Sequence, residues 1–181
     1  VGVEMDNYYY SAKAHAVLGD AGLALDDATG LVNWCRAIKS EAEIGYMRKA
    51  ARISEAVIDG MVDRISPGVR KNEMVAEAYR DAIRGVGDDW GDYPAIVPLV
   101  PSGADAAAPH LTWNGDPFRT GEATTLEVSG CYRRYHAPLC RSVFLGTPPD
   151  EMTRAEAAVI EGLEAGLDAA RAGHQARDVA A

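Results

Sequence analysis

The chain has 181 residues, of which 48% are hydrophobic and 25% charged, and its formal net charge is -9. This length suffices for one domain with a sizeable core, and the acidic balance argues against nucleic acid or an anionic membrane as the main partner. No apolar run reaches the roughly 18 residues of a membrane span, and no segment has the basic start and apolar core of a signal peptide. Three cysteines without metal-site spacing fit a reducing cytosol, so we expect a cytoplasmic protein.

Both ends of the chain lie inside expected elements. The chain begins without Met in a strand-like segment and stops within a helical pattern, so we expect it to be a piece of a longer protein. Ser11 is a suitable N-cap and Gly22 a suitable C′ residue, which predicts a helix between them. Residues 30–38, GLVNWCRAI, then predict a strand.

A capping box marks the start of a long helix. Ser40 and Glu43 have the Ser-x-x-Glu spacing in which the two residues cap each other. Apolar residues recur at helical spacing as far as Pro67-Gly68, where the helix is expected to end. A second helix is expected over residues 72–84, followed by a loop rich in Gly and Asp.

The pattern then changes from helical to alternating, which indicates strands. They are expected over residues 95–101, 110–113, 123–130 and 141–145, and a further helix over residues 153–172. Helices followed by a run of strands predict an α+β fold. The AAA run at 106–108 is interpreted as a solvated loop that needs no function.

Residues 127–146, EVSGCYRRYHAPLCRSVFLG, are expected to form a hairpin of two strands joined by a Gly turn. The hairpin carries an acid, an imidazole and three arginines. Arg133 and Arg134 are adjacent, so they would face opposite sides of a strand, and at most one of them would reach a site.

A faint internal repeat runs through the chain. Gly68 and Gly173 each follow a long helix, and the segments that start at them, GVRKNEMVA and GHQARDVAA, are similar. Asp63 aligns with Asp168 in the same register. A unit of two helices followed by strands is therefore expected to begin again where the chain stops.

Several short motifs together resemble the creatinase, prolidase and aminopeptidase P family. They are RxIKSxxEIxxMxxAA from residue 36, ISPG from residue 65, and SG at 102 followed by His110. The resemblance implies the pita-bread fold, a pseudo-symmetric pair of αβ halves around a central active site. It implies that residues 1–37 are the end of an N-terminal domain with its linker, and that residues 38–181 are the first half and the start of the second half of the catalytic domain. A homodimer is usual in this family.

Within the family, the chain looks most similar to the ectoine hydrolases. The likeness rests on GVEMDNYYYSAKA, LVNWCRAIKSEAEI, PHLTW and GCYRRYHAPLCR. It implies a hydrolase that opens the cyclic amidine ring of ectoine, a small zwitterion, to N-acetyl-2,4-diaminobutyrate in compatible-solute catabolism. The second half of the catalytic domain carries further catalytic groups in this family, so we expect the isolated chain to be inactive. We also expect it to be poorly stable, because half of the central sheet would be uncovered.

The resemblance places Glu127 and Pro138 at the positions of two metal-binding aspartates. Glu is a competent metal ligand, but a single acid cannot hold a metal pair and Pro138 offers no side-chain donor. We therefore expect hydrolysis without a metal or any other cofactor. Without the resemblance, a solvated strand face would be the favoured interpretation of an acid in the alternation TLEVSG.

Glu127 and His110 are the candidate catalytic residues. An anionic Glu127 would pair with the cationic ring and either attack the amidine carbon or activate water. His110, at a position used for proton transfer in creatinase-like relatives, would shuttle a proton, because imidazole exchanges protons near neutral pH. The alternative for His110 is a loop histidine bonded to a backbone carbonyl.

Four further side chains are candidates for substrate binding. Trp113 and Tyr93 would form an apolar or cation–π wall for the ring, unless they are core aromatics. Arg141, which matches a family arginine, would bind the substrate carboxylate in a bidentate fork or only brace the fold. His136 would be a substitute proton donor or a surface residue of the hairpin.

Three other functions remain open at this point. A creatinase-like amidinohydrolase would make similar demands on the pocket and also works without a metal. An Xaa-Pro metallopeptidase would need the metal pair, against which Pro138 counts heavily. A non-catalytic pita-bread binding module would have no reason to keep Glu127 together with His110.

Overall fold

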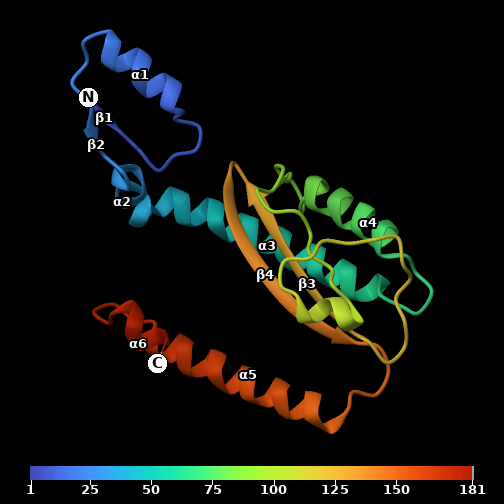
Figure 1. Cartoon of the computed structure of the whole chain (residues 1–181). Helices are drawn as coiled ribbons and strands as arrows, with labels where there is room; N and C mark the ends of the chain where they lie inside the picture. The colour runs from blue at the N-terminus through green and yellow to red at the C-terminus, as the bar shows by residue number, and fades with distance from the viewer. Residues whose placement is uncertain (181) are drawn as a thin grey trace. The chain divides into compact units, whose positions relative to one another are not determined.

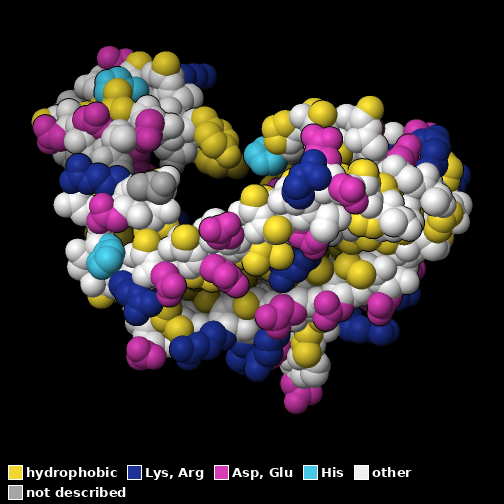
Figure 2. Space-filling model, turned by 90° about the horizontal axis from the view of Figure 1, so that it is seen from below, with side chains coloured by type: hydrophobic (Ala, Val, Ile, Leu, Met, Phe, Trp, Pro, Cys, Tyr) yellow, Lys and Arg dark blue, Asp and Glu magenta, His cyan; other side chains and the backbone are white. Residues whose placement is uncertain are grey.

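A computed structural model describes residues 1–180 of the chain and divides into two compact units, Val1–Tyr46 and Met47–Ala181 (Figure 1). No helix within the described residues is long and apolar enough to cross a membrane. In the space-filling view, acidic and basic side chains are interspersed over the face shown (Figure 2).

The first unit contains a two-residue parallel pairing and short helices. Strand β1 pairs with β2, and Ser11 caps α1 by accepting a hydrogen bond from the Ala14 N–H at 3.1 Å, as expected. The element bounds are β1 Gly2–Val3, α1 Ala12–Asp20, β2 Asp26–Asp27 and α2 Leu31–Ala37.

The strand predicted over residues 30–38 is wrong, because these residues form α2. Gly30 adopts a left-handed conformation and Trp34 donates its N–H to the Gly30 carbonyl, which closes a helical turn. A short apolar run does not distinguish a strand from a helix, and here the backbone satisfies its hydrogen bonds locally.

The two long helices predicted by apolar spacing are present. They are α3 Glu41–Arg64 and α4 Lys71–Arg84. The capping box is confirmed, since the Ser40 N–H donates to the Glu43 carboxylate at 2.7 Å and the Glu43 N–H donates to the Ser40 hydroxyl at 3.4 Å. Figure 1 shows α4 and most of α3 beside the hairpin, in the second unit.

The hairpin is longer than predicted and its turn differs. Strand β3, Ala123–Tyr132, pairs antiparallel with β4, Tyr135–Phe144. The two-residue turn is Arg133-Arg134, with φ angles of 48° and 66°, so the predicted Gly turn is wrong and neither arginine lies on a strand face. Positive φ at both central residues is the conformation of a type I′ turn, which matches the twist of the strands it joins.

Proline explains why residues 95–101 do not form the predicted strand. Leu99 and Glu127 exchange both backbone hydrogen bonds, at 2.9 and 3.0 Å, so the segment does lie along β3. Thr125 then donates to the Pro101 carbonyl at 3.0 Å, but Pro101 has no N–H to return that bond. The segment therefore contacts β3 through single bridges. Residues 110–113 also form no strand, and Thr112 accepts one bond from the Val100 N–H.

The core lies between α3, α4 and the inner face of β3. Its largest buried side chains are Phe118, Ile53, Met61, Met74 and Leu126. Helix α3 contacts the hairpin directly: the Ser54 hydroxyl accepts a hydrogen bond from the Gly130 N–H at 2.7 Å and also bonds the carbonyl of Ala137, the cross-strand partner of Gly130. One side chain thus fixes both strands to α3.

Two further helices follow the hairpin, α5 Asp150–Ala169 and α6 Ala176–Ala180. Gly68 and Gly173 have φ angles of 94° and 93°, and the next helix begins three residues after each of them. The faint sequence repeat therefore corresponds to a repeated helix–turn–helix arrangement. Apolar residues on α5 are exposed at helical spacing, namely Val159, Ile160, Leu163 and Leu167.

An ion-paired cluster ties the loop after α4 to α3. Asp89 accepts hydrogen bonds from Lys49 at 2.5 Å and Arg52 at 2.8 Å. The hydrogen bond from Lys49 holds the pKa of the Asp89 carboxyl below its ordinary value. A depressed pKa contributes stability that is present above the unfolded value of about 3.9 and is lost as the pH falls through the folded value.

We therefore expect Asp89→Asn to destabilise the protein at pH 7 and to lose this effect on acidification below about pH 4. The exposed neighbour gives a matched control, Asp88→Asn, which should change stability little at either pH. Urea unfolding at pH 7 and at pH 3 measures both differences. A destabilisation by Asp89→Asn that is equal at the two pH values would contradict the ion-pair explanation.

Candidate active site

Glu127 and His110 line the same pocket. It has a volume of about 380 Å³ and is lined by residues of β3 and of the loop that contains the 3-10 helix η1, Gly103–Ala107. The remaining lining residues are Leu99, Pro101, Ala106, Ala107, Ala108, Pro109 and Thr125. The structure thus brings together the two residues for which a catalytic role is expected.

The alternation of β3 directs Glu127 into this pocket. Leu126 and Val128 are buried against the core, whereas Thr125 and Glu127 are partly accessible on the opposite face. Side chains alternate between the faces of a strand, so the apolar neighbours of Glu127 fix its direction. The acid is neither part of the core nor on a fully solvated surface.

Pro138 and Cys140 lie on the same sheet face as Glu127. The register pairs Ser129 with Pro138 and Glu127 with Cys140. Because Glu127 directs both backbone groups to Leu99, Glu127 and Cys140 form a non-hydrogen-bonded pair. Pro138 lies two residues before Cys140, so it also belongs to a non-hydrogen-bonded pair and its backbone nitrogen points away from β3. The proline therefore interrupts no hydrogen bond between the two strands.

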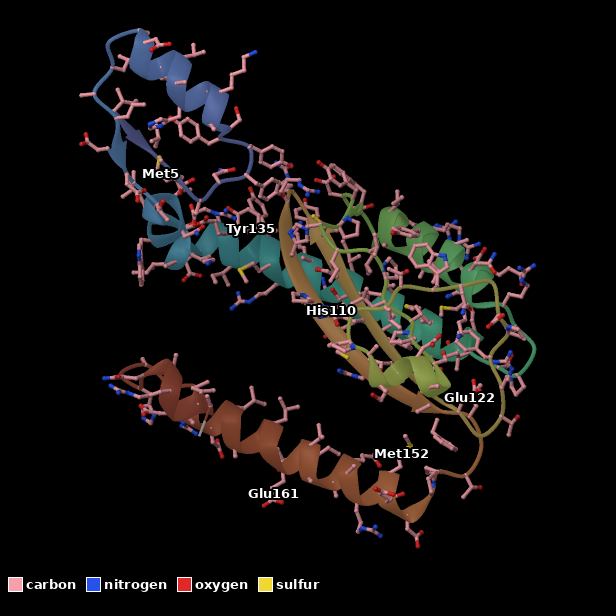
Figure 3. All side chains as sticks on the ribbon, viewed as in Figure 1. Met5, His110, Glu122, Tyr135, Met152 and Glu161 are labelled. Atoms are coloured by element: carbon pink, nitrogen blue, oxygen red, sulfur yellow. The ribbon has the colours of Figure 1, made fainter. Side chains whose placement is uncertain are left out.

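His110 has an unusual backbone conformation, with a φ of 63°. A non-glycine residue in the left-handed region is uncommon and is often found at functional sites. His110 follows the loop residues Ala106–Pro109, which line the same pocket, and lies beside the hairpin (Figure 3). No hydrogen bond from the ring to a backbone carbonyl is present among the described residues, so the loop-histidine alternative lacks its partner.

The chain is similar to known proteins in sequence and in fold. Residues 45–181 match metallopeptidase family M24. Ectoine hydrolase from Halomonas elongata is 51% identical over 99% of this chain and 47% of its own length. A prolidase from Pyrococcus horikoshii superposes with a TM-score of 0.87 at 21% identity, over 98% of this chain and 50% of that chain. A Xaa-Pro dipeptidase from Bacillus anthracis superposes with a TM-score of 0.79 at 26% identity, over 91% of this chain and 45% of that chain.

The chain belongs to metallopeptidase family M24. Its fold is part of the pita-bread fold of the prolidases and aminopeptidase P, and the chain spans about half the length of the relatives it matches. The resemblance identified from the short motifs is therefore confirmed, including the likeness to ectoine hydrolase.

The M24 chain described here does not offer the donors of a metal pair. Among the described residues, Glu127 is the one carboxylate that lines the pocket. Pro138, which the resemblance places at the position of the second metal-binding aspartate, carries no side-chain donor. Within residues 1–180 no three His, Cys, Asp or Glu side chains are grouped so that they could hold a metal ion. The residues of this half therefore do not fit a two-metal centre.

Trp113 and Tyr93 do not line the pocket of Glu127. Trp113 packs edge-on against Tyr79 of α4, with ring centroids 6.2 Å apart, and burial raises the pKa of the Tyr79 hydroxyl. Tyr93 is exposed and lies under the Arg134 guanidinium, 3.9 Å from the ring centroid. Both aromatic residues therefore make intramolecular contacts in place of the proposed wall.

His136 joins the hairpin to the preceding loop. Its Nε2 accepts a hydrogen bond from the Ala95 N–H at 3.0 Å, and its Nδ1 lies 3.0 Å from the Arg134 carbonyl. Both contacts are satisfied by a ring with the proton on Nδ1. His136 thus has a structural partner on each ring nitrogen and is not among the residues that line the pocket.

Arg141 lies on the wrong face of the hairpin to reach Glu127. Its cross-strand partner is Leu126, whose side chain is buried in the core, so Arg141 lies on the core-facing side of the hairpin. Arg141 lines a separate hollow of about 480 Å³ with Asp59, Val62 and other residues of α3 and β4. The geometry of this half therefore favours the bracing role over the carboxylate anchor.

Sequence reasoning missed two contributors to the pocket. The Ala106–Ala108 run, interpreted as a solvated loop without function, forms an apolar wall facing Glu127. Thr125 lines the pocket as well, and its position two residues before Glu127 was a usable signal, since alternate residues of a strand share a face. The loop had no comparable signal because its position depends on tertiary contacts.

The αL conformation of His110 allows a conservative test of its role. We expect His110→Asn to lower the kcat of the full-length protein by about 10²-fold or more, because Asn tolerates a positive φ but transfers no proton. The thermal unfolding midpoint should stay close to that of the unmodified protein. An Asn variant that keeps its folded stability and turns over within a few-fold of the unmodified rate would rule out proton transfer by His110.

Proposed function

We propose that the protein is a hydrolase that opens the cyclic amidine ring of ectoine to N-acetyl-2,4-diaminobutyrate, and that it does so without a bound metal. The observation that carries the proposal is the joint lining of one small pocket by Glu127 and His110, with Pro138 on the same sheet face. The 51% identity to an ectoine hydrolase over 99% of the chain supports the choice of substrate.

The pocket suits a small cation with apolar edges. Its volume of about 380 Å³ lies at the small end of ligand sites, and its wall is alanine, proline and leucine around one carboxylate. In such surroundings an anionic Glu127 attracts the amidinium ring of ectoine more strongly than it would in water. The apolar wall accommodates the ring carbons.

The reaction assigns each residue one task. Glu127 attacks the amidine carbon or takes a proton from a water molecule that attacks it. The ring C–N bond then breaks, and His110 supplies the proton that the leaving nitrogen needs. After attack by water, the water oxygen remains on the carbon as the acetyl carbonyl. After direct attack by Glu127, water hydrolyses the covalent intermediate at the same carbon, which releases the Glu127 carboxylate and leaves the acetyl carbonyl. Water is consumed and no other reactant is required. As an enzyme of compatible-solute catabolism the protein would act in the cytoplasm, as a homodimer in its full-length form.

Product analysis distinguishes this proposal from the alternatives. The full-length protein is incubated separately with ectoine, creatine and an Xaa-Pro dipeptide, and the products are identified by mass spectrometry. We expect N-acetyl-2,4-diaminobutyrate from ectoine and no hydrolysis of the other two compounds. Hydrolysis of creatine or of the dipeptide in place of ectoine would assign the protein to one of the other reactions. No product from any of them would favour a binding module.

A further inference from the structure

Thr125 places a hydroxyl group in the pocket of Glu127 and His110. It lies two residues before Glu127 on β3, so the two side chains face the same side of the sheet, about 7 Å apart along the strand. Thr125 is partly accessible there, whereas the adjacent Thr124 is buried on the opposite face. Apart from these three polar residues, the described lining of the pocket is alanine, proline and leucine.

The Thr125 hydroxyl has no task inside the molecule. Its neighbour Thr124 donates a hydrogen bond to the Ser102 hydroxyl at 2.8 Å and so fixes β3 to the preceding loop. The Thr125 N–H bonds to the Pro101 carbonyl at 3.0 Å, but among residues 1–180 the Thr125 hydroxyl makes no hydrogen bond. A polar group placed without a partner in an otherwise apolar pocket is available to a ligand.

A substrate of the proposed kind needs a donor at this place. Ectoine carries its carboxylate on the ring carbon next to one amidine nitrogen, so this group lies close to the carbon that reacts at Glu127. Two carboxylates at short range repel each other, and the carboxylate of the substrate therefore requires a donor of its own. His110 serves the leaving nitrogen, and Arg141 lies on the opposite sheet face.

We propose that Thr125 is a specificity-determining residue, whose hydroxyl donates a hydrogen bond to the carboxylate of the substrate. This role rests on the proposed function. A neutral donor suits the position, because a cation there would pair with Glu127 and compete with the amidinium ring. The carboxylate does not change during ring opening, so the bond contributes equally to the ground state and the transition state. Thr125 therefore lowers KM for amidines that carry a carboxylate.

Substitution of Thr125 tests this role in the full-length protein. Thr125→Val keeps the branched shape and removes the hydroxyl, so kcat/KM for ectoine should fall about tenfold, mainly through a higher KM. Thr125→Ser keeps a donor and should retain most of the activity. Turnover of 2-methyltetrahydropyrimidine, the same ring without the carboxylate, should change less than twofold in the Val variant. An equal loss with both compounds, or a KM for ectoine that does not change, would overturn the role.

Thr124→Val is the matched control for the loss of a threonine hydroxyl. It removes the buried hydrogen bond to Ser102, so it should lower the thermal unfolding midpoint and leave KM for ectoine within twofold. Thr125→Val should show the opposite pattern. Absence of ectoine turnover in the unmodified protein would refute the proposed function. Calorimetric titration with ectoine then still decides the role of Thr125: weaker binding to the Val variant supports it, and equal binding or none to either protein overturns it.

Discussion

Gly130→Ala should destabilise the protein by about 3 kcal/mol. A Cβ atom at this position would lie 2.3 Å from the Ala50 carbonyl oxygen and 2.6 Å from the Ser54 backbone nitrogen, both of which belong to the backbone of α3. Neither atom can rotate away, so the helix and the strand must separate, and the 2.7 Å hydrogen bond from Gly130 to Ser54 is weakened as well. Overpacking and a lost buried hydrogen bond together have this magnitude.

Gly162→Ala is the matched control for this effect. Gly162 lies within α5 in ordinary helical conformation, and a Cβ atom there would meet nothing within 4 Å. The same chemical change should therefore stabilise the helix by about 0.5–1 kcal/mol. Chemical unfolding of the two full-length variants compares them directly. Equal effects at the two positions would contradict the close approach of β3 to α3.

Glu127→Gln should reduce kcat/KM for ectoine by about 10³-fold with little loss of stability. Gln has the same shape, but it neither attacks the amidine carbon nor takes a proton from water, and it does not pair with a cation. Because Glu127 is partly accessible and makes no ion pair within residues 1–180, its replacement removes no structural contact. Steady-state kinetics and a thermal melt of the full-length variant measure the two quantities.

A distant acid provides the control for charge alone. Glu161 projects from the exposed surface of α5 (Figure 3). Glu161→Gln changes the net charge by the same amount and should leave kcat/KM within twofold. If both variants lose activity equally, the effect of Glu127→Gln comes from the overall electrostatic field of the protein. If neither variant loses activity, Glu127 is not the centre of the reaction.

Local patterns predicted the helices of this chain well. The capping box at Ser40 and the apolar spacing of α3 and α4 depend on contacts within a few residues, which the sequence contains. Residues 31–37 were assigned the wrong type because a short apolar run has no distinguishing period. The broken segment at 95–101 carried a usable signal, since Pro98 and Pro101 each lack the N–H of a strand.

The residues of the candidate site were predicted in part, and the errors of that prediction have a common cause. Glu127 and His110 were predicted as site residues because the family motifs mark their positions, and both line one pocket of the structure. The faces of Arg141 and Cys140 depend on the pairing register, where a shift by one residue reverses every side chain. Gly130 was interpreted as a turn residue, although its lack of a side chain serves the contact with α3. Register and interelement distance are tertiary facts that no local pattern encodes.

Metal-free ring opening centred on Glu127 requires that turnover continue after metal ions are removed. The full-length protein is treated with a strong chelator, desalted, checked for residual metal by elemental analysis, and incubated with ectoine. We predict that N-acetyl-2,4-diaminobutyrate forms at an unchanged rate and that added Mn²⁺, Co²⁺ or Zn²⁺ does not increase it. Loss of turnover in the metal-depleted protein, restored by adding one of these ions, would contradict the claim.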